Sequence, residues 1–370
     1  MTVQTPAFRY VSYPQEVIFA PGALARLYEK VERPGWRRFM LCTSRSQRAG
    51  GWVSRIESIL QSSLVALFDQ VQPHVQDVQV REALGLAEAK KADAVIGLGG
   101  GSPIGMAKAV GFQLQLPIIA IPTTYAGSEM TAVYGITHTD EHPPRKVTVS
   151  DPKIAPSLVI YDPELTLGLP PSLTASTGIN ALAHCLEALY SKTRNPLSTA
   201  AAVDGIRHIH NALLRCFMDG GSLEARSEML RGSHLAGLSL ASVSMGLHHG
   251  LCHVLGGTAN IPHGTANSII LPHAIRFNAD ATAPQLAPAA EAMNISGNAA
   301  SPEKRVEVMV QEISTLIGTM QLPQRLREAG VVQADLPHLA EIAFQNNTVQ
   351  NNPKPIRDVA QLERLLQDAW

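Results

Sequence analysis

The sequence has almost no net charge and no long apolar run. Its 370 residues include 30 Lys and Arg against 31 Asp and Glu, which leaves a formal net charge of −1 at pH 7. Nucleic-acid binding uses a basic surface, and this balance does not supply one. No stretch of about 18 apolar residues is present to span a bilayer, and the N-terminus lacks the pattern of a signal peptide. We therefore expect a cytoplasmic protein with neither nucleic acid nor a membrane as its partner.

Cysteine is scarce, and its spacing shows no pairs. The four cysteines are scattered along the chain and none of them forms a CxxC motif: Cys42, Cys185, Cys216 and Cys252. Three of them lie in apolar segments. This pattern predicts buried thiols in a reducing compartment rather than a disulfide framework.

The first part of the chain alternates between apolar runs and helical patterns. The apolar runs read as buried strands, and the segments 52–60 and 79–91 have apolar residues at helical spacing. Strands interleaved with helices predict a parallel sheet that is covered on both faces. We expect an α/β domain over residues 1–166, with strands at 38–42, 65–68, 94–98, 118–121 and 158–161.

The second part of the chain, residues 167–370, predicts an all-α domain. Helical patterns cover 174–190, 198–218 and 222–246, and the small-residue segment 233–254 predicts a closely packed helix. A run of Gln and Asn between 345 and 353 predicts a polar loop. Ligands commonly bind in clefts between domains, so we expect the site in the cleft between these two domains.

A glycine-rich turn follows the apolar run that ends at Leu98. Gly99, Gly100, Gly101 and Ser102 connect that expected strand to an expected helix. Glycines leave backbone N–H groups uncovered, and a helix N-terminus carries partial positive charge, so such a turn holds a phosphate or pyrophosphate well. Tight packing alone also explains a turn of this kind. The remaining motifs must decide between a phosphate site and simple packing.

Histidines at helical spacing stand out in the second part. Asn180 and His184 lie four residues apart, His249 and His253 repeat that spacing, and His263 follows. Three histidines and an amide oxygen can form the ligand shell of a divalent metal. The plainer interpretation is a region that is simply rich in histidine, as His208, His210 and His234 also suggest.

Several motifs in order resemble the iron-type, or group III, alcohol dehydrogenases over most of the chain. They are GGGSPIGMAK at 99–108, PTTYAGSEMT at 122–131, GINALAH at 178–184, HHGLCHVLGG at 248–257, PHG at 262–264 and LPHA at 271–274. The resemblance implies a Rossmann-like dinucleotide-binding domain followed by an all-α domain, the architecture of dehydroquinate synthase. It also implies a nicotinamide cofactor and a homodimer.

Two departures from that family pattern point to its maleylacetate reductase branch. The chain has Gly105 and Asn180 where the alcohol dehydrogenases have aspartates, and it has the doubled His248-His249. The branch reduces the carbon–carbon double bond of maleylacetate with NADH or NADPH and yields 3-oxoadipate in aromatic degradation. By this resemblance the substrate is a carboxylate-bearing enone or ketone. A lysine often follows the doubled histidine in that branch, whereas this chain has Gly250.

The resemblance also implies a set of site residues. The candidate ligands of an iron or zinc ion are Asn180, His184, His249 and His263. A neutral amide in place of a carboxylate weakens the binding of a dication, so we expect that no metal is required. The candidate catalytic residues are His184, His249, His253, His263 and Tyr125, with His253 as the proton relay.

The cofactor candidates come from both the glycine turn and the resemblance. The latter adds Thr123, Thr124 and Lys146 as contacts of the nicotinamide nucleotide. Family members that favour NAD have an aspartate after the strand at 39–42, where this chain has Ser44 and Arg45. A serine removes the repulsion of a 2′-phosphate and Arg45 could pair with it, so we predict that NADPH is accepted, alone or with NADH. The alternative is that Arg45 faces solvent.

Three other interpretations stay open. The first is a metal-dependent alcohol or aldehyde dehydrogenase of the same superfamily. The second is a lyase or cyclase of the dehydroquinate synthase type, which disagrees with Asn180 and His184 in place of a carboxylate ligand. The third is a nucleotide-binding protein that has lost its chemistry.

Overall fold

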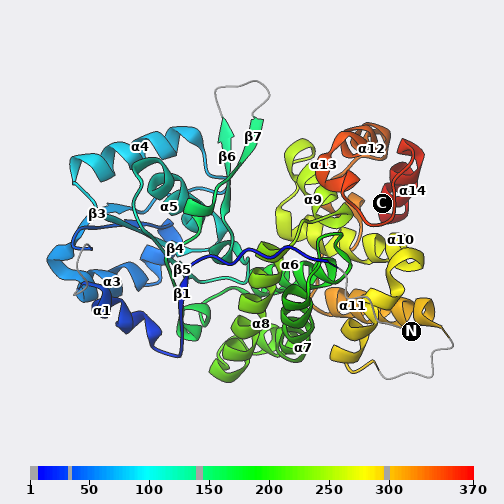
Figure 1. Ribbon diagram of the computed structural model, residues 1–370, viewed down its shortest axis with the longest axis horizontal. Helices are drawn as coiled ribbons and strands as arrows, with labels where there is room; N and C mark the ends of the chain where they lie inside the picture. Colours follow the sequence, from blue (N-terminus) through cyan, green and yellow to red (C-terminus); the bar gives the residue numbers. More distant parts are fainter. Residues whose placement is uncertain (1–6, 32–35, 139–144, 296–300) are drawn as a thin grey trace. The chain divides into compact units, whose positions relative to one another are not determined.

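The computed structural model describes residues 7–31, 36–138, 145–295 and 301–370, and the chain divides into two compact units (Figure 1). We name them the α/β unit and the helical unit. The α/β unit comprises Tyr13–Pro170 and Asp219–Leu230. The helical unit comprises Met1–Ser12, Pro171–Met218 and Arg231–Trp370.

A six-stranded parallel sheet forms the centre of the α/β unit, in the order β1-β8-β5-β4-β2-β3. The five predicted strands are confirmed as β2 (Phe39–Cys42), β3 (Leu64–Phe68), β4 (Ala94–Gly99), β5 (Ile118–Pro122) and β8 (Leu158–Tyr161). Sequence reasoning missed β1 (Glu16–Phe19) and the antiparallel hairpin of β6 (Val133–His138) and β7 (Arg145–Ser150). In a parallel sheet the carboxyl ends of all strands lie at one edge, which places the segments after β2, β4 and β5 together.

Helices cover both faces of this sheet, as the apolar runs predict (Figure 1). Alternate strand residues face opposite sides: Phe39 and Leu41 pack with α3 (Trp52–Leu60) on one face. Met40 and Cys42 pack with α4 (Asp77–Ala89) and α5 (Gly101–Leu114) on the other. This burial on both faces explains why the strands read as continuous apolar runs instead of alternating ones. The short helices α1 (Tyr28–Val31) and α2 (Arg45–Ala49) complete the unit.

The helical unit contains no strand among its described residues, in agreement with the predicted all-α architecture. Its helices are α6 (Pro171–Tyr190), α7 (Pro196–Met218), α8 (Leu223–Ser242, from Arg231 onward in this unit), α9 (Leu247–Thr258), α10 (His263–Ala292), α11 (Pro302–Thr319), α12 (Leu336–Gln345), α13 (Asn347–Gln350) and α14 (Val359–Ala369). Helices α9, α10, α12 and α14 share one apolar core with Leu251, Ile270 and Leu366 in it. The four cysteines of the chain are free and buried, as predicted.

Three predictions about this unit were wrong. The expected helix over 222–246 ends at Ser242, and a new helix begins at Leu247, so the single closely packed helix expected over 233–254 is also interrupted. Two distant side chains hold this second start: the Gly246 N–H donates to Glu187 Oε1 (2.7 Å), and the Leu247 N–H donates to Asn352 Oδ1 (3.3 Å). The expected polar loop at 345–353 contains α13, and Asn352 in it is 1% exposed. Composition cannot reveal either feature because both depend on contacts across the fold.

Among the described residues, no helix combines the length and the apolar character that a membrane span needs.

A partly buried histidine on α8, His234, predicts acid sensitivity of the fold. Burial lowers the pKa of His234 to about 4 from 6.5. Between these values the unfolded chain binds more protons than the folded one, so stability falls as the pH is lowered. We expect the free energy of unfolding to fall by about 2 kcal/mol more between pH 8 and pH 5 in the wild type than in H234Q. Urea unfolding at both pH values measures this, and identical pH dependences of the two proteins would refute it.

Candidate active site and cofactor cradle

The glycine-rich turn forms a close-packed junction between β4 and α5. Gly99 has φ +139°, a conformation that side chains rarely adopt, and a Cβ there would lie 2.8 Å from Pro103 Cγ. A Cβ at Gly100 would lie 3.2 Å from Thr124 Cγ2 and Oγ1. At Gly101, by contrast, a Cβ would meet no described heavy atom within 4 Å. Two of the glycines are thus required for packing, and the third faces open space.

The N-terminus of α5 lies beside that open space. Its cap residue is Gly100, and no side chain of the described residues caps it. The first N–H groups of a helix need an acceptor, and their partial positive charge favours an anion. A pyrophosphate above Gly101 would supply that acceptor.

The neighbouring strand ends bring the other cofactor candidates to the same edge. The Thr123 N–H donates to the Gly99 carbonyl oxygen at 3.0 Å, and Gln47 Nε2 donates to Thr123 Oγ1 at 3.1 Å. Thr43 Oγ1 donates to the Leu98 carbonyl oxygen at 2.9 Å, which ties the end of β2 to β4. The glycine turn, Thr123 and Thr124 therefore lie together at the carboxyl ends of β4 and β5.

Ser44 and Arg45 lie at the start of α2, directly after β2. Ser44 is the N-cap residue of that helix, and its hydroxyl lies 2.9 Å from the hydroxyl of Ser46. Arg45 is exposed. Lys146 lies on β7 in register with Thr137, but its side chain falls outside the described part of the chain.

Gly105 and Lys108 are buried one turn apart in α5. A Cβ at Gly105 would lie 3.0 Å from Val75 Cγ2, so this position has little room for an aspartate. Lys108 Nζ donates to the carbonyl oxygens of Ser128, Thr131 and Val133 at 2.5 to 2.9 Å. Burial lowers the Lys108 pKa to about 7, and the Glu129 carboxylate opposes that shift. The lysine fixes the segment that follows Thr123 and Thr124.

In the helical unit, α6 and α9 bring their histidines together. Asn180, His184 and Glu187 lie at positions i, i+4 and i+7 of α6 and so share one face. The His184 and His249 rings stack with centroids 4.7 Å apart, and His263 at the start of α10 lies 6.1 Å from His249. His253 stacks on His263 at 5.8 Å. The structure thus places all four predicted histidines in one series of rings.

Burial differs along this series. Asn180, His184 and His249 are at most 5% exposed, whereas His253 and His263 are exposed. Burial lowers the pKa of His184 and of His249 well below 6.5, and the neighbouring histidines lower both further. The inner rings are therefore neutral at pH 7.

Glu187 is a buried carboxylate that sequence reasoning missed. It is 1% exposed and contacts His249 Nδ1 directly, while its Oε1 accepts the Gly246 N–H. Burial raises its pKa, and His248 and the backbone N–H groups at the start of α9 oppose that shift. An acidic residue three positions after His184 in an otherwise apolar helix was the available signal. Glu187, His248 and His249 bring potential ligand atoms within 4.8 Å of one another.

Two ring nitrogens, one of His184 and one of His249, suit a divalent metal. His184 Nδ1 and His249 Nε2 are buried and have no hydrogen-bond partner within the described residues. Buried polar atoms are normally satisfied, and the carboxylate behind His249 is the arrangement that supports a ligating histidine. The donor set therefore fits a metal, although Asn180 adds an amide and no charge.

Tyr125 lies in the α/β unit and is fully buried. Its hydroxyl accepts a hydrogen bond from Arg226 Nη1 at 3.0 Å, and the same guanidinium donates to the Leu169 carbonyl oxygen. The predicted catalytic role of Tyr125 stays a prediction.

Gly250 is a packing position between α9 and α13. A Cβ there would lie 2.5 Å from Val349 Cγ2 and 2.8 Å from the Val349 nitrogen. A lysine at this position would require the backbone of α13 to move. Glycine at position 250 therefore allows α13 to pack against α9 at Val349, and a lysine there would not.

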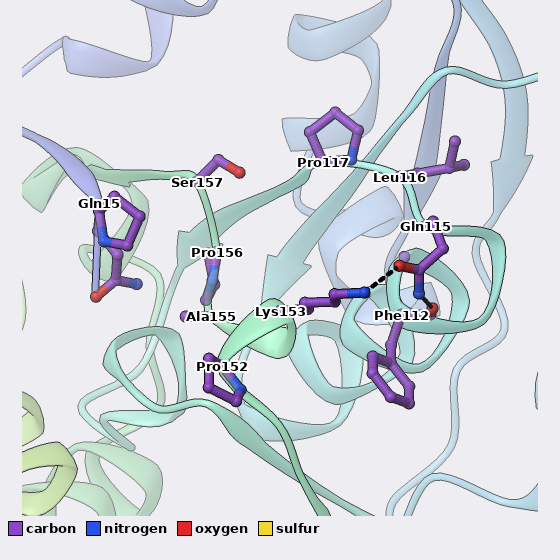
Figure 2. A pocket seen from close by; sticks show the side chains of 12 residues that line it. Gln15, Phe112, Gln115, Leu116, Pro117, Pro152, Lys153, Ala155, Pro156 and Ser157 are labelled. Carbon is purple, nitrogen blue, oxygen red and sulfur yellow. Dashed lines mark hydrogen bonds between the residues drawn. The ribbon is translucent and has the colours of Figure 1, made fainter. Parts of the chain in front are cut away.

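A pocket of about 270 Å³ lies at the opposite edge of the sheet (Figure 2). Pro117 and Ser157 directly precede β5 and β8, and Lys153 Nζ donates to Gln115 Oε1 at 3.1 Å beside them. None of the predicted site residues lines this pocket. The cradle at the carboxyl ends of the strands remains the candidate cofactor site.

Comparison with known proteins agrees with this geometry. Residues 14–163 match a sequence profile described as iron-containing alcohol dehydrogenase, and residues 174–370 match the C-terminal profile of that family. A maleylacetate reductase of Burkholderia cepacia is 37% identical over 365 residues, which is 98% of each chain. The crystal structure of maleylacetate reductase from Agrobacterium tumefaciens is 34% identical, covers 99% of both chains and has a TM-score of 0.89. A 1,3-propanediol oxidoreductase structure is 31% identical, with a TM-score of 0.93 over 99% of this chain and all of the other.

Two alanine substitutions separate packing from ligand binding in the glycine turn. G99A should lower the free energy of unfolding by about 1–3 kcal/mol because of its backbone conformation and its contact with Pro103. G101A should leave stability within about 0.5 kcal/mol of the wild type. Its methyl group occupies the open space, so we expect weaker NAD(P)H binding in fluorescence titrations. Unchanged NAD(P)H affinity in G101A would exclude this space as the phosphate position.

Proposed function

The chain belongs to the iron-containing alcohol dehydrogenase family and is an NAD(P)-dependent oxidoreductase, and on that basis we propose that it reduces maleylacetate to 3-oxoadipate. The observation that carries the proposal is Asn180, a buried neutral amide beside His184 where the family pattern has a metal-binding aspartate. The similarity to maleylacetate reductases over 98% of the chain supports the same substrate class.

The α/β unit holds the cofactor in this proposal. Gly101 and the N-terminus of α5 would hold the pyrophosphate, and Thr123 and Thr124 would contact the nicotinamide nucleotide. When bound, the cofactor supplies a hydride. Lys108 holds the segment after Thr124 in place through the carbonyl oxygens that it binds.

The histidines act on the substrate oxygen. Addition of hydride to the β-carbon of a conjugated enone moves charge onto the carbonyl oxygen, and a proton then goes to the α-carbon. Hydrogen bonds to that oxygen stabilise the developing enolate. The stacked His184 and His249 line this place, and the exposed pair of His253 and His263 exchanges protons with water, His253 being the relay.

A divalent metal, where present, would be held by His184, His249 and His263 with the Asn180 amide oxygen. It would polarise the carbonyl as a Lewis acid. Asn180 contributes no negative charge, so the site binds a dication more weakly than the aspartate of the family pattern would. Reduction of an enone can proceed on hydrogen-bond donors, and we propose that no metal is required.

A second candidate is a metal-dependent alcohol or aldehyde dehydrogenase. The two unpartnered ring nitrogens of His184 and His249 favour it, as does the carboxylate behind His249. Similarity to a 1,3-propanediol oxidoreductase over the whole chain supports it too.

One assay separates these two functions. With maleylacetate, the purified protein should oxidise NAD(P)H at a rate that prior dialysis against a chelator changes by less than about twofold. The loss of NAD(P)H absorbance measures this rate, and metal content before and after dialysis is the control. No turnover of maleylacetate, together with aldehyde reduction that requires added Fe²⁺ or Zn²⁺, would establish the second function instead.

Ser44 provides the test of cofactor choice. Ser44→Asp places a carboxylate where the adenosine ribose is expected, so it should repel a 2′-phosphate and bind a 2′-hydroxyl. We expect the ratio of kcat/KM for NADPH to that for NADH to fall by about tenfold. Ser54→Asp, at an exposed position of α3, adds the same charge elsewhere and should leave the ratio unchanged. An unchanged ratio in S44D would remove Ser44 from the cofactor site.

A further inference from the structure

His248 and Glu187 form a buried hydrogen-bonded series with His249, and the reaction as described uses only His249 of the three. His248 is fully buried and lies beside His249, with their Nδ1 atoms 3.2 Å apart. The other nitrogen of His248, Nε2, lies 3.3 Å from the carbonyl oxygen of Asn267. The Nδ1 of His249 also contacts Glu187.

The direction of these hydrogen bonds follows from the acceptor at one end. A carbonyl oxygen only accepts, so the shorter contact, at 3.3 Å to Asn267, assigns the proton of His248 to Nε2, and Cys252 Sγ, 3.7 Å from this nitrogen, is then a second acceptor. A neutral His248 then has a lone pair on Nδ1. Two facing lone pairs at 3.2 Å would repel, so the proton between the two rings belongs to Nδ1 of His249.

Glu187 requires the same proton position from the other side. Its two oxygens accept the Gly246 N–H at 2.7 Å and the His249 N–H at 3.4 Å, at the positive end of α9. An oxygen that accepts backbone N–H groups also accepts the ring N–H of His249. Two independent partners therefore assign the Nδ1 proton of His249.

We propose that Glu187 and His248 are positioning residues that fix the tautomer of His249, with the proton on Nδ1 and a lone pair on Nε2. This nitrogen is buried and has no hydrogen-bond partner within the described residues. A group with a proton to donate, such as a water molecule, or a metal would bind this nitrogen and would meet a ring held in one orientation. The first histidine of the pair thus orients the second.

Glu187→Gln reverses one hydrogen bond without changing the shape of the side chain. The glutamine oxygen can still accept the Gly246 N–H, but its NH₂ group then faces His249 Nδ1 and needs an acceptor there. The His248 Nδ1 lone pair still favours the proton on His249 Nδ1, so E187Q sets the two partners against each other, and part of the His249 population should carry its proton on Nε2. Long-range ¹H–¹⁵N NMR of histidine-labelled protein reports the tautomer directly, with His249 assigned by comparison with His249→Asn.

We expect the wild type to show a protonated Nδ1 and an unprotonated Nε2 at His249, and E187Q to show a mixture of the two tautomers. In turnover, E187Q should lose about 10- to 100-fold in kcat with an unchanged KM for NAD(P)H, because the cofactor residues lie in the α/β unit. Glu187→Asp keeps the carboxylate and should recover part of the loss. Glu312→Gln, which alters an exposed carboxylate 3.7 Å from His210, is the matched control and should change neither readout.

A protonated Nε2 in the wild type would overturn the proposal, as would an unaltered His249 spectrum in a folded E187Q. If E187Q does not fold, the wild-type spectrum alone decides. The inference takes from the proposed function only that His249 belongs to the reacting site. Because the spectra need no substrate, failure on maleylacetate leaves the tautomer test intact.

Discussion

The contact between Glu187 and the start of α9 is the interaction on which the helical unit's site depends. One carboxylate accepts the Gly246 N–H and contacts the ring of His249, so it sets both where α9 begins and how its histidine is turned. A buried carboxylate is costly unless hydrogen bonds satisfy it, and here the backbone of α9 and an imidazole do so. The same contact explains why residues 222–246 do not continue as one helix. Fold and chemistry share a single hydrogen-bonded cluster.

The cofactor cradle depends on a different constraint: the backbone of the glycine turn packs directly against Pro103 and Thr124. Gly99 is required by its conformation and Gly100 by Thr124, so the turn cannot carry side chains where β4 meets α5. What remains open is the space over Gly101 and the uncapped N-terminus of α5. Lys108 also holds the segment after Thr124, since its Nζ donates to three carbonyl oxygens of that segment. These contacts form without a ligand.

Much of the fold and part of the site could be predicted from the sequence. Five of the six strands of the parallel sheet, the helices around them and the spacing of Asn180 with His184 follow from periodicity, because local burial imposes it. The β6–β7 hairpin was missed because polar residues interrupt its apolar residues, and β1 was missed although it is as long as the predicted β2 and β8. Asn352 was read as part of a polar loop, although it is buried and binds the start of α9. A polar residue that is satisfied by distant partners looks like a surface residue in a sequence.

The sequence by itself determined the fold class, the glycine turn and the family, since these rest on local patterns and on motifs in a given order. Only the tertiary structure decided which histidines are buried, which nitrogens of their rings are engaged, and that a carboxylate remains at the site although position 180 has none. The physical reason is that hydrogen-bond direction and burial depend on groups far apart in the chain. His249 takes its orientation from Glu187, 62 residues earlier, and that distance leaves no mark in the local sequence.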